Sequence, residues 1–390
     1  MNKVFFNPAA NGAHPGARVY DRENADRLRT LFGHSPSFAP TPLQRLDGLA
    51  ARMEIGELWA KDERDRWGLG SFKSLGGAFA VVELAADFLS RREESSISPA
   101  DIFAGRAPQA REMTVATATA GNHGRAVAFG AKLAGTRAVI FVYGDVPKRQ
   151  RQAIADLGAE LVSVEGDYEA ACRAAAKACA AHGWIMVSDV AEKDYTEIPE
   201  RIMRGYCVLA AEALEHLPEP PTHVILQAGV GGLATPVASY FRNCLSPGAV
   251  PGKVCSFFPS GTATKQRTGP RIAVVEAATV PCLMESARNN RETRTLSTGP
   301  TNLNRLDCPT PSSSTWPVLR ALASVFVGVD SETAAEAAAL LRQEGLSTTP
   351  TGAAGLAGLL ALSRESGAFD KFELNGKSRV LIVMTEEAVE

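Results

Sequence analysis

Lys73 is the residue of this sequence that is best placed to act as a nucleophile. It lies in the run SFKSLGG at 71–77, where an extended stretch at 58–63 and a loop give way to a predicted helix. From Leu75 onward, apolar residues recur at the i, i+3, i+4 and i+7 spacing of an amphipathic helix. The positive end of the helix dipole and partial burial both favour the neutral amine of Lys73, which can attack an aldehyde. A solvated surface lysine is the alternative interpretation of this segment alone.

A second segment that could do chemistry is TATAGNHGR at 117–125. It lies between a short β-like run at 114–116 and an alanine-rich helical pattern at 126–134. Its small residues let backbone N–H groups approach an anion closely. The pattern indicates an anion-binding loop between a strand and a helix.

A third segment, GVGGLA at 229–234, is rich in glycine. It follows a predicted strand at 223–226 and precedes a helical pattern that runs through Tyr240, so several N–H groups can converge on a phosphate at the helix N-terminus. A dinucleotide-binding turn is the competing interpretation. The acidic residue that such a turn needs about 20 positions further on is missing near 249–252, which argues against a nicotinamide cofactor.

Together, the lysine segment and the asparagine loop at 117–125 resemble those of the pyridoxal-phosphate enzymes of the tryptophan-synthase-β type. Members of that family carry a Ser-x-Lys-x-Arg/Leu-Gly lysine and a Ser/Thr-x-Gly-Asn-His/Thr-Gly loop. PTPL at 40–43, the glycine-rich run and TPTGAAG at 349–355 resemble three further elements, so the likeness extends along most of the chain. It implies an α/β architecture of fold type II, with two domains that are each a mainly parallel sheet flanked by helices.

Within this family, three runs are similar to the diaminopropionate ammonia-lyases. They are DYTEIP at 194–199, IMRGY at 202–206 and LDCPTPSS at 306–313. The resemblance implies a lyase that eliminates ammonia from 2,3-diaminopropionate and yields pyruvate and ammonia. A threonine or serine dehydratase, or another β-eliminating lyase on a different β-substituted amino acid, needs the same lysine and loops. A non-catalytic protein that binds pyridoxal phosphate is a second alternative.

The same resemblance implies roles for single residues around the cofactor, pyridoxal 5′-phosphate. Lys73 would bond to its aldehyde carbon and, once displaced, would remove the α-proton of an amino acid as general base. Asn122 would bind the 3′-oxygen of the ring. Thr385, directly after the last predicted strand, would lie near the pyridine nitrogen, although an ordinary strand-end threonine is the alternative. The other residues implied in cofactor binding are Phe72, Gly229, Val230, Gly231, Gly232 and Leu233.

The α-carboxylate of the substrate is implied to lie in the asparagine loop. The loop residues that would receive it are Thr119, Ala120, Gly121 and His123. A loop-stabilising role is an equal alternative for His123. Asp189 follows a predicted strand at 185–187, where active-site residues collect, and is the candidate for binding or protonating the distal amine of the substrate. A carboxylate that caps the following turn is an equally consistent interpretation.

Four positions depart from the ammonia-lyase pattern. These enzymes usually carry an aspartate directly before Gly-Asn-His, where it is the base for the D-isomer, but this chain has Ala120. A methyl group cannot take a proton, so the L-isomer is favoured. Thr349 replaces the glutamate of the E-P-(S/T)-G-A-A-G element, and Arg305 and Pro309 interrupt a Gly-Leu-Asp/Asn-Cys-Gly pattern. These substitutions leave the identity of the substrate open.

Composition and charge exclude several classes of function. The chain has 390 residues, 45% of them hydrophobic, which is enough for two core-forming domains. Its formal net charge is −2, with Lys and Arg scattered among Asp and Glu, so we expect no nucleic-acid or acidic-membrane partner. No apolar window approaches the roughly 20 residues of a membrane span, and the N-terminus has no signal-peptide pattern. We expect a soluble, cytoplasmic protein, and the resemblance implies a homodimer.

The seven cysteines form no C-x-x-C pair and no metal-like spacing with histidine. This usage fits reduced thiols and predicts no metal site. Cys308 lies in a loop rich in Pro, Ser and Thr that the resemblance places near the active site, and most such thiols are packed residues, so it is given no role.

The order of apolar runs and helical patterns is typical of βα units around a mainly parallel sheet. We predict a smaller domain at 76–189 and a larger one from 1–75 with 190–390, with Lys73 and the asparagine loop at the cleft. A long loop at 246–270 is interpreted as an insertion. The clearest strands are predicted at 138–143, 161–164, 185–187, 223–226, 272–275 and 380–384, and helices at 148–157 and 168–181, with Gly158 and Gly183 as their stops.

Overall fold

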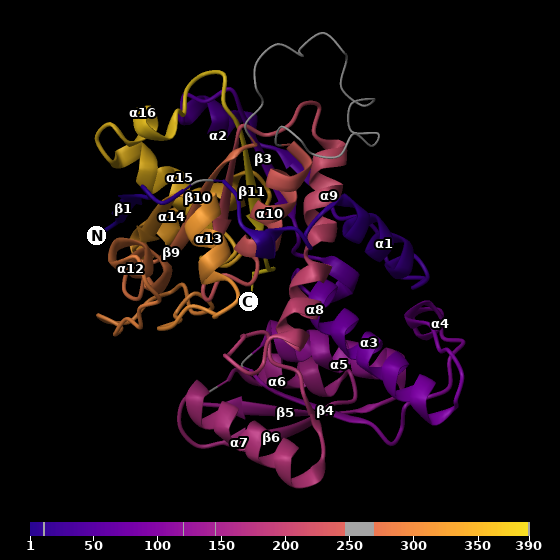
Figure 1. The fold of residues 1–390 in the computed structure, drawn as a ribbon. Coiled ribbons are helices and arrows are strands. Elements are labelled where there is room, and N and C mark those ends of the chain that lie inside the picture. The colour runs from indigo at the N-terminus through magenta and orange to yellow at the C-terminus, as the bar shows by residue number, and fades with distance from the viewer. Residues whose placement is uncertain (11, 120, 145, 246–268, 389–390) are drawn as a thin grey trace. The chain divides into compact units, whose positions relative to one another are not determined.

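The chain divides into two compact units. The computed structural model describes residues 1–10, 12–119, 121–144, 146–245 and 269–388 (Figure 1). The first unit comprises Met1–Ala25, Pro40–Arg64 and Leu209–Glu390, and the second comprises Asp26–Ala39 and Asp65–Val208. The second unit contains the predicted smaller domain, 76–189, and extends beyond both of its ends. Ala120 and all but the last two residues of the loop predicted at 246–270 lie outside the described residues.

The first unit is built on a seven-stranded sheet with the strand order β1-β10-β9-β8-β11-β3-β2. Its strands are β1 (Lys3–Phe6), β2 (Leu43–Arg45), β3 (Glu57–Asp62), β8 (His223–Gln227), β9 (Arg271–Ala277), β10 (Ala323–Val329) and β11 (Arg379–Met384). The five central strands are parallel, and the short edge strands β1 and β2 pair antiparallel. Residues on both faces of β8 and β11 are buried, which is why 224–226 and 380–384 are continuous apolar runs. The strands predicted at 223–226, 272–275 and 380–384 are confirmed.

Helices pack around this sheet. They are α2 (Asp47–Arg52), α10 (Ala234–Leu245), α12 (Cys282–Asn289), α13 (Trp316–Leu322), α14 (Ser331–Gln343), α15 (Ala354–Arg364) and α16 (Ala368–Phe372), with the 3-10 helix η1 (Pro15–Ala17). Along the chain, α1 (Arg22–Phe32) and α9 (Cys207–His216) pass from one unit into the other. Helix α15 lies close against the sheet at Gly358. A Cβ at this position would lie only 2.4 Å from Val275 Cγ2, so this close approach requires glycine.

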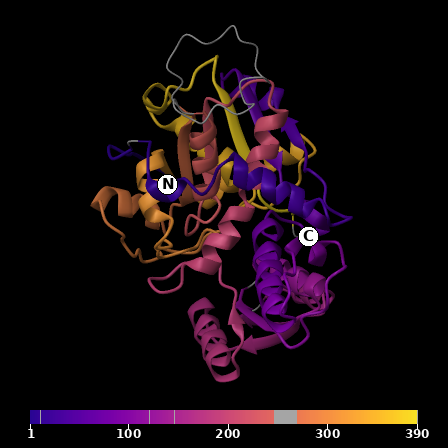
Figure 2. The same ribbon diagram turned by 45° about the vertical axis from the view of Figure 1, so that its right-hand side comes forward.

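The second unit is built on a parallel four-stranded sheet with the order β6-β5-β4-β7. Its strands are β4 (Thr114–Ala118), β5 (Arg137–Tyr143), β6 (Glu160–Val164) and β7 (Ile185–Met186). Ala116 and Phe141 belong to one cluster with α7, whereas Ile140 faces the α5 side of the sheet, as the alternation of side chains along a strand requires. Helix α7 and helix α5 therefore cover opposite faces of these strands (Figures 1 and 2).

The helices of the second unit lie before, between and after its strands in the sequence. They are α3 (Ser74–Arg92), α4 (Pro99–Phe103), α5 (Asn122–Ala134), α6 (Lys148–Ala155), α7 (Tyr168–His182) and α8 (Glu197–Gly205), with the 3-10 helix η2 (Arg66–Gly68). The Asp167 side chain accepts a hydrogen bond from Ala170 N and caps the start of α7, and Gly183 ends the helix with a φ of +68°. The helices predicted at 148–157 and 168–181 are thereby confirmed.

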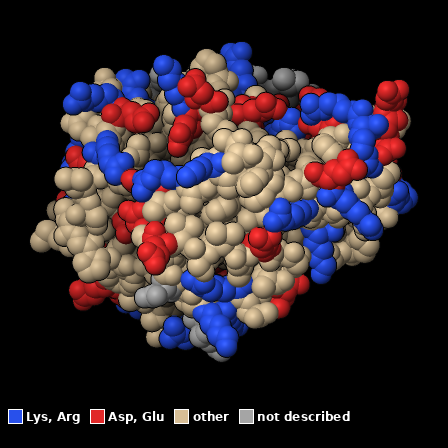
Figure 3. Space-filling view, turned by 90° about the horizontal axis from the view of Figure 1, so that it is seen from below, with Lys and Arg blue, Asp and Glu red and all other residues tan. Residues whose placement is uncertain are grey.

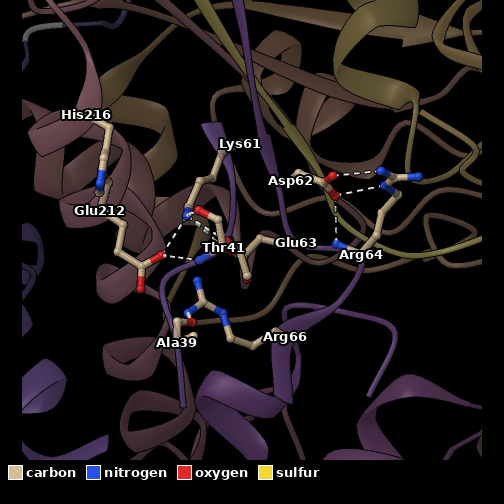
Figure 4. Close-up of polar contacts among 9 residues, drawn as sticks. All are labelled: Ala39, Thr41, Lys61, Asp62, Glu63, Arg64, Arg66, Glu212 and His216. Atoms are coloured by element: carbon tan, nitrogen blue, oxygen red, sulfur yellow. Dashed lines mark hydrogen bonds and ion pairs between the residues drawn. The ribbon is translucent and has the colours of Figure 1, made fainter. Parts of the chain in front are cut away.

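A buried ionic cluster fixes the PTPL segment to β3 in the first unit (Figure 4). Lys61 Nζ donates hydrogen bonds to Thr41 O, Thr41 Oγ1 and Glu212 Oε2, each at 2.6 Å. Thr41 Oγ1 in turn donates to Glu63 Oε1 at 2.6 Å. Lys61, Glu63 and Glu212 are each at most 1% exposed, so the cluster compensates charges that water cannot reach.

Charges of both signs are spread over the face of the molecule in Figure 3, and no large area of that face is of one sign. Among the helices of the described residues, none is long and apolar enough to cross a membrane. The described residues also contain no group of three or more His, Cys, Asp and Glu side chains that could hold a metal ion.

Candidate active site

Lys73 and Asp189 lie in contact within the second unit, although 116 positions separate them in the sequence. Lys73 is the residue directly before α3, and its Nζ lies 2.5 Å from Asp189 Oδ2. The two side chains are 27% and 20% exposed, so both are partly accessible to solvent. The Phe72 ring lies beside this amine, with 5.4 Å from Nζ to the ring centre. The structure thus brings together two residues that the sequence predicts to be catalytic.

His123 holds the backbone next to Asp189. Its Nε2 lies 2.8 Å from Val187 O, and because a carbonyl can only accept, Nε2 carries the proton. Its Nδ1 lies 3.9 Å from Asp189 Oδ2 and has no hydrogen-bond partner among the described residues. The side chain is buried in the first turn of α5. One ring nitrogen of His123 therefore supports the loop, while the other faces the carboxylate.

The carboxylate of Asp189 is kept ionised by its neighbours. Burial by itself would raise the pKa of Asp189, but the charges of His123 and Lys73 and the hydrogen bond from Lys73 outweigh it and hold this pKa well below its usual range. An ionised carboxylate beside a lysine amine can bind an ammonium group, or stabilise the amine after it has taken a proton.

The asparagine loop connects the end of β4 to the start of α5. Thr119 N donates to Phe141 O at 3.0 Å, and Thr119 Oγ1 accepts from Gly121 N at 3.2 Å. A Cβ on Gly124 would lie 2.6 Å from Thr119 Cγ2, so glycine there allows the helix to start close to the strand end. Asn122 is the first residue of α5. The described residues on either side of Ala120 thus lead from a strand end to a helix N-terminus, a place where backbone N–H groups can bind an anion.

The glycine-rich run lies in the first unit between β8 and α10. A Cβ on Gly229 would lie 2.7 Å from Cys308 Sγ, and one on Gly231, whose φ is +98°, would lie 2.7 Å from Thr315 Oγ1. Val230 O accepts hydrogen bonds from Thr315 Oγ1 at 2.5 Å and from Ser312 N at 3.1 Å. The loop before α13, which contains Ser312 and Thr315, therefore holds the backbone of the glycine-rich run in place. Larger residues at these two glycines would displace that loop.

The backbone N–H groups of the run suit a phosphate. Within the described residues, none of the N–H groups from Gly229 to Leu233 donates a hydrogen bond. These unpaired donors gather in front of the N-terminus of α10, where the helix dipole favours an anion. Gly229, Val230, Gly231, Gly232 and Leu233 therefore fit the phosphate of the predicted cofactor.

Thr385 directly follows β11, and its side chain is buried. Its Oγ1 accepts a hydrogen bond from Gln227 Nε2 at 3.2 Å. None of the described residues accepts a hydrogen bond from the Thr385 hydroxyl, which therefore keeps its proton for a ligand. The arrangement fits a pyridine nitrogen that accepts. Gln227 is a further contributor without a signal in the sequence, because it is a single polar residue at the end of β8, directly after the strand predicted at 223–226.

Two of the positions that depart from the ammonia-lyase pattern contact one carboxylate, that of Glu386. Thr349 Oγ1 donates to Glu386 Oε1 at 2.5 Å, and Arg305 Nε lies 2.8 Å from Glu386 Oε2. The Glu386 side chain is 4% exposed. Thr349 and Arg305 are thus linked through the residue that directly follows Thr385. The carbonyl of Pro309 accepts a hydrogen bond from Thr295 N at 2.8 Å.

Tyr195 and Tyr206 are further residues near Lys73 and Asp189 to which the sequence analysis gave no role. Tyr206 is buried against the edge of Phe72, with 4.7 Å between ring centres, and its hydroxyl has no hydrogen-bond partner among the described residues. The phenol of Tyr195 contacts the backbone just before Asp189. Both residues lie in runs that resemble the ammonia-lyases, and that resemblance is the only sequence signal for them.

Comparisons with known proteins find a family match and relatives that cover most of the chain. Residues 34–386 match the family described as pyridoxal-phosphate dependent enzyme. The diaminopropionate ammonia-lyase of Escherichia coli (strain K12) is 30% identical over 379 residues, 94% of this chain and 89% of the relative. The ammonia-lyase of the same name from Salmonella typhimurium (strain LT2) is 33% identical over 370 residues, 90% of this chain and 86% of the relative.

A solved structure is similar over the same extent. The crystal structure of the Escherichia coli diaminopropionate ammonia-lyase in complex with D-serine has a TM-score of 0.84 and 30% identity, and the match covers 99% of this chain and 94% of that one. The fold class that the motifs imply is confirmed by this similarity, and so is the pyridoxal-phosphate cofactor by the family match. This chain belongs to the family of pyridoxal-phosphate dependent enzymes.

Proposed function

We propose that this enzyme is a lyase that eliminates ammonia from 2,3-diaminopropionate, with the L-isomer favoured, and yields pyruvate and ammonia. The observation that carries the proposal is the Lys73–Asp189 pair, with 2.5 Å between Nζ and Oδ2 and a carboxylate that stays ionised. An ionised carboxylate binds the distal ammonium of diaminopropionate. The hydroxyl leaving group of serine or threonine would instead need a proton donor at this place.

Lys73 and Asp189 have different roles in the proposed reaction. When bound, pyridoxal phosphate supplies a ring that withdraws electrons from the α-carbon of the substrate. Lys73 takes the α-proton on Nζ, and Asp189 holds the 3-ammonium, which leaves as neutral ammonia with the C3–N electron pair. Water then converts the three-carbon product to pyruvate and a second ammonia.

We propose the following holders of the cofactor and the substrate. The N–H groups of Gly229 to Leu233 bind the phosphate, Thr385 donates to the ring nitrogen, Asn122 binds the 3′-oxygen, and Phe72 packs beside Lys73. The α-carboxylate of the substrate is bound by Thr119, Ala120, Gly121 and His123. Since Ala120 has no proton-accepting group, Lys73 is the base, and it serves the isomer whose α-hydrogen faces it.

A homodimer in the cytoplasm is part of the same proposal. It is supported by the resemblance to the ammonia-lyases and by seven cysteines without disulfide-like or metal-like spacing. The mixed surface charge supports a small amino acid as the partner, with no nucleic acid and no membrane surface.

A substrate panel tests this function. The purified enzyme loaded with pyridoxal phosphate is incubated with L- and D-diaminopropionate, L-serine, D-serine and L-threonine, and keto acid and ammonia are both measured. Diaminopropionate should release two molecules of ammonia for each keto acid, whereas serine and threonine release one. The Lys73→Ala variant is the control. Preference for serine or threonine would favour the dehydratase alternative, and bound cofactor without turnover of any amino acid would favour the non-catalytic one.

A further inference from the structure

Tyr195 contacts the backbone that carries Asp189, although the proposed reaction does not use it. Its phenol donates a hydrogen bond to Met186 O at 2.7 Å and accepts one from Ser188 N at 3.0 Å. Burial raises the pKa of Tyr195 well above its ordinary value, so the phenol keeps the proton that it donates. One hydroxyl thus links the last residue of β7 to the residue directly before Asp189.

A tight turn returns Tyr195 to this position. Glu192 N donates to Tyr195 O at 3.1 Å, and Tyr195 N donates to Glu192 O at 3.0 Å. Helix α8 begins two residues later, at Glu197. The DYTEIP run at 194–199 thus contains the end of this turn, which carries the phenol, and the start of α8.

Other contacts also hold the residues on the two sides of Asp189: Ser188 Oγ accepts a hydrogen bond from Val190 N at 3.2 Å and donates one to Val190 O at 3.4 Å. Val187 N donates to Ala116 O at 2.8 Å, and Val187 O accepts from His123 Nε2 at 2.8 Å. Residue 187 is thus held by β4 and α5. The N–H group of Ser188 is held by the Tyr195 phenol, and the next side chain reaches Lys73.

We propose that Tyr195 is a positioning residue that keeps the carboxylate of Asp189 against Lys73 Nζ. The inference rests on the proposed function, in which Asp189 holds the distal ammonium of the substrate. Without the phenol, Met186 O and Ser188 N lose their shared partner, and the residue before Asp189 is no longer linked to the end of β7. A carboxylate that moves by 1 Å no longer lies in hydrogen-bond contact with both the amine and the leaving group.

The Tyr195→Phe variant removes the hydroxyl and keeps the ring. Hydrogen exchange at the Ser188 amide of the free protein should become about two- to tenfold faster, as expected for the loss of one hydrogen bond. The crystal structure of the variant should show a longer distance from Lys73 Nζ to Asp189 Oδ2. In the loaded enzyme, kcat for diaminopropionate should fall about tenfold, with a smaller change in KM. Tyr168→Phe, which removes a phenol that is 37% exposed in the same unit, should change none of these quantities.

A double variant separates positioning from a general loss of stability. If Tyr195 acts through Asp189, Tyr195→Phe combined with Asp189→Asn has the same kcat as Asp189→Asn alone. If the losses in kcat of the two single variants multiply in the double variant, the proposal is overturned. An unchanged rate of hydrogen exchange at the Ser188 amide in Tyr195→Phe would also overturn it. If the unaltered enzyme does not turn over diaminopropionate, the proposed function fails, while hydrogen exchange and the crystal structure still decide whether Tyr195 positions Asp189.

Discussion

The side-chain amide of Gln227 donates hydrogen bonds to the hydroxyl of Thr385 at 3.2 Å and to Val383 O at 3.0 Å. Because the hydroxyl already accepts from Gln227, its own proton points elsewhere. A hydroxyl that donates matches a ring nitrogen without a proton. Such a ring withdraws electrons less strongly than a protonated one. It favours a reaction in which the electron pair left on the α-carbon expels a β-substituent at once.

Thr385→Val tests this relationship because it keeps the shape of the side chain and removes the donor. We expect the affinity for pyridoxal phosphate to fall about two- to tenfold, the range for one hydrogen bond, and the visible absorbance band of the bound cofactor to shift. Titration of the cofactor-free protein by absorbance measures both. Thr333→Val, at a buried threonine of α14 in the same unit, is the matched control and should leave the affinity unchanged. Equal affinities in the two variants would contradict the role of Thr385.

Asp189→Asn should separate diaminopropionate from serine as substrates. The asparagine keeps the size of the side chain but cannot hold an ammonium by charge, so kcat/KM for diaminopropionate should fall about 100-fold or more. Turnover of serine, which has no distal ammonium, should fall less. Steady-state kinetics on both substrates give the ratio, and an equal loss on both would argue that Asp189 serves Lys73 alone.

Ala120→Asp should give or improve turnover of D-diaminopropionate, because it restores a carboxylate that can remove the α-proton on the face opposite to Lys73. The L-isomer should react as before, since its base is unchanged. Pyruvate release from each isomer is the measurement, with Ala120→Asn as the control that matches size without a base. A carboxylate without any effect on the D-isomer would indicate that this loop approaches the substrate differently.

The lysine segment and the sheet were predictable because their signals are local. The helix after Lys73 follows from apolar spacing, and strands such as 380–384 follow from runs of β-branched residues. Strand β10 was missed because it begins at Ala323 directly after Leu322, the last residue of α13, without glycine or proline between them. No short-range pattern marks that boundary.

The partners of the site residues could not be predicted in the same way. Gln227 is the last residue of β8, and its contact with Thr385 depends on the pairing of β8 with β11. The Arg305–Glu386 ion pair joins residues about 80 positions apart, and the sequence alone showed only that Arg305 was unusual. Such contacts depend on topology, which spacing along the chain does not encode.

Removal of one partner from the buried cluster around Lys61 should strongly destabilise the protein, because it leaves a buried charge without compensation. Lys61→Met leaves the Glu212 carboxylate buried without its ammonium, and we expect the free energy of unfolding to fall by about 3–5 kcal/mol. Lys61→Met combined with Glu212→Leu replaces the pair by apolar side chains and should recover much of that loss. Urea unfolding followed by circular dichroism measures both variants. A double variant that is less stable than Lys61→Met would contradict this account.

His223 should make the protein less stable in mild acid. Burial lowers the pKa of His223 to about 4, below the value of about 6.5 in an unfolded chain, so the unfolded state binds a proton first. The contribution of His223 to the free energy of unfolding is therefore constant above pH 6.5. It falls by at most about 3 kcal/mol as the pH drops from 6.5 to 4. Urea unfolding at pH 7.5 and pH 4.5 should show a smaller acid loss in His223→Gln than in the wild type, whereas exposed His34→Gln should behave as the wild type. An acid loss that is the same in all three proteins would show that His223 does not carry it.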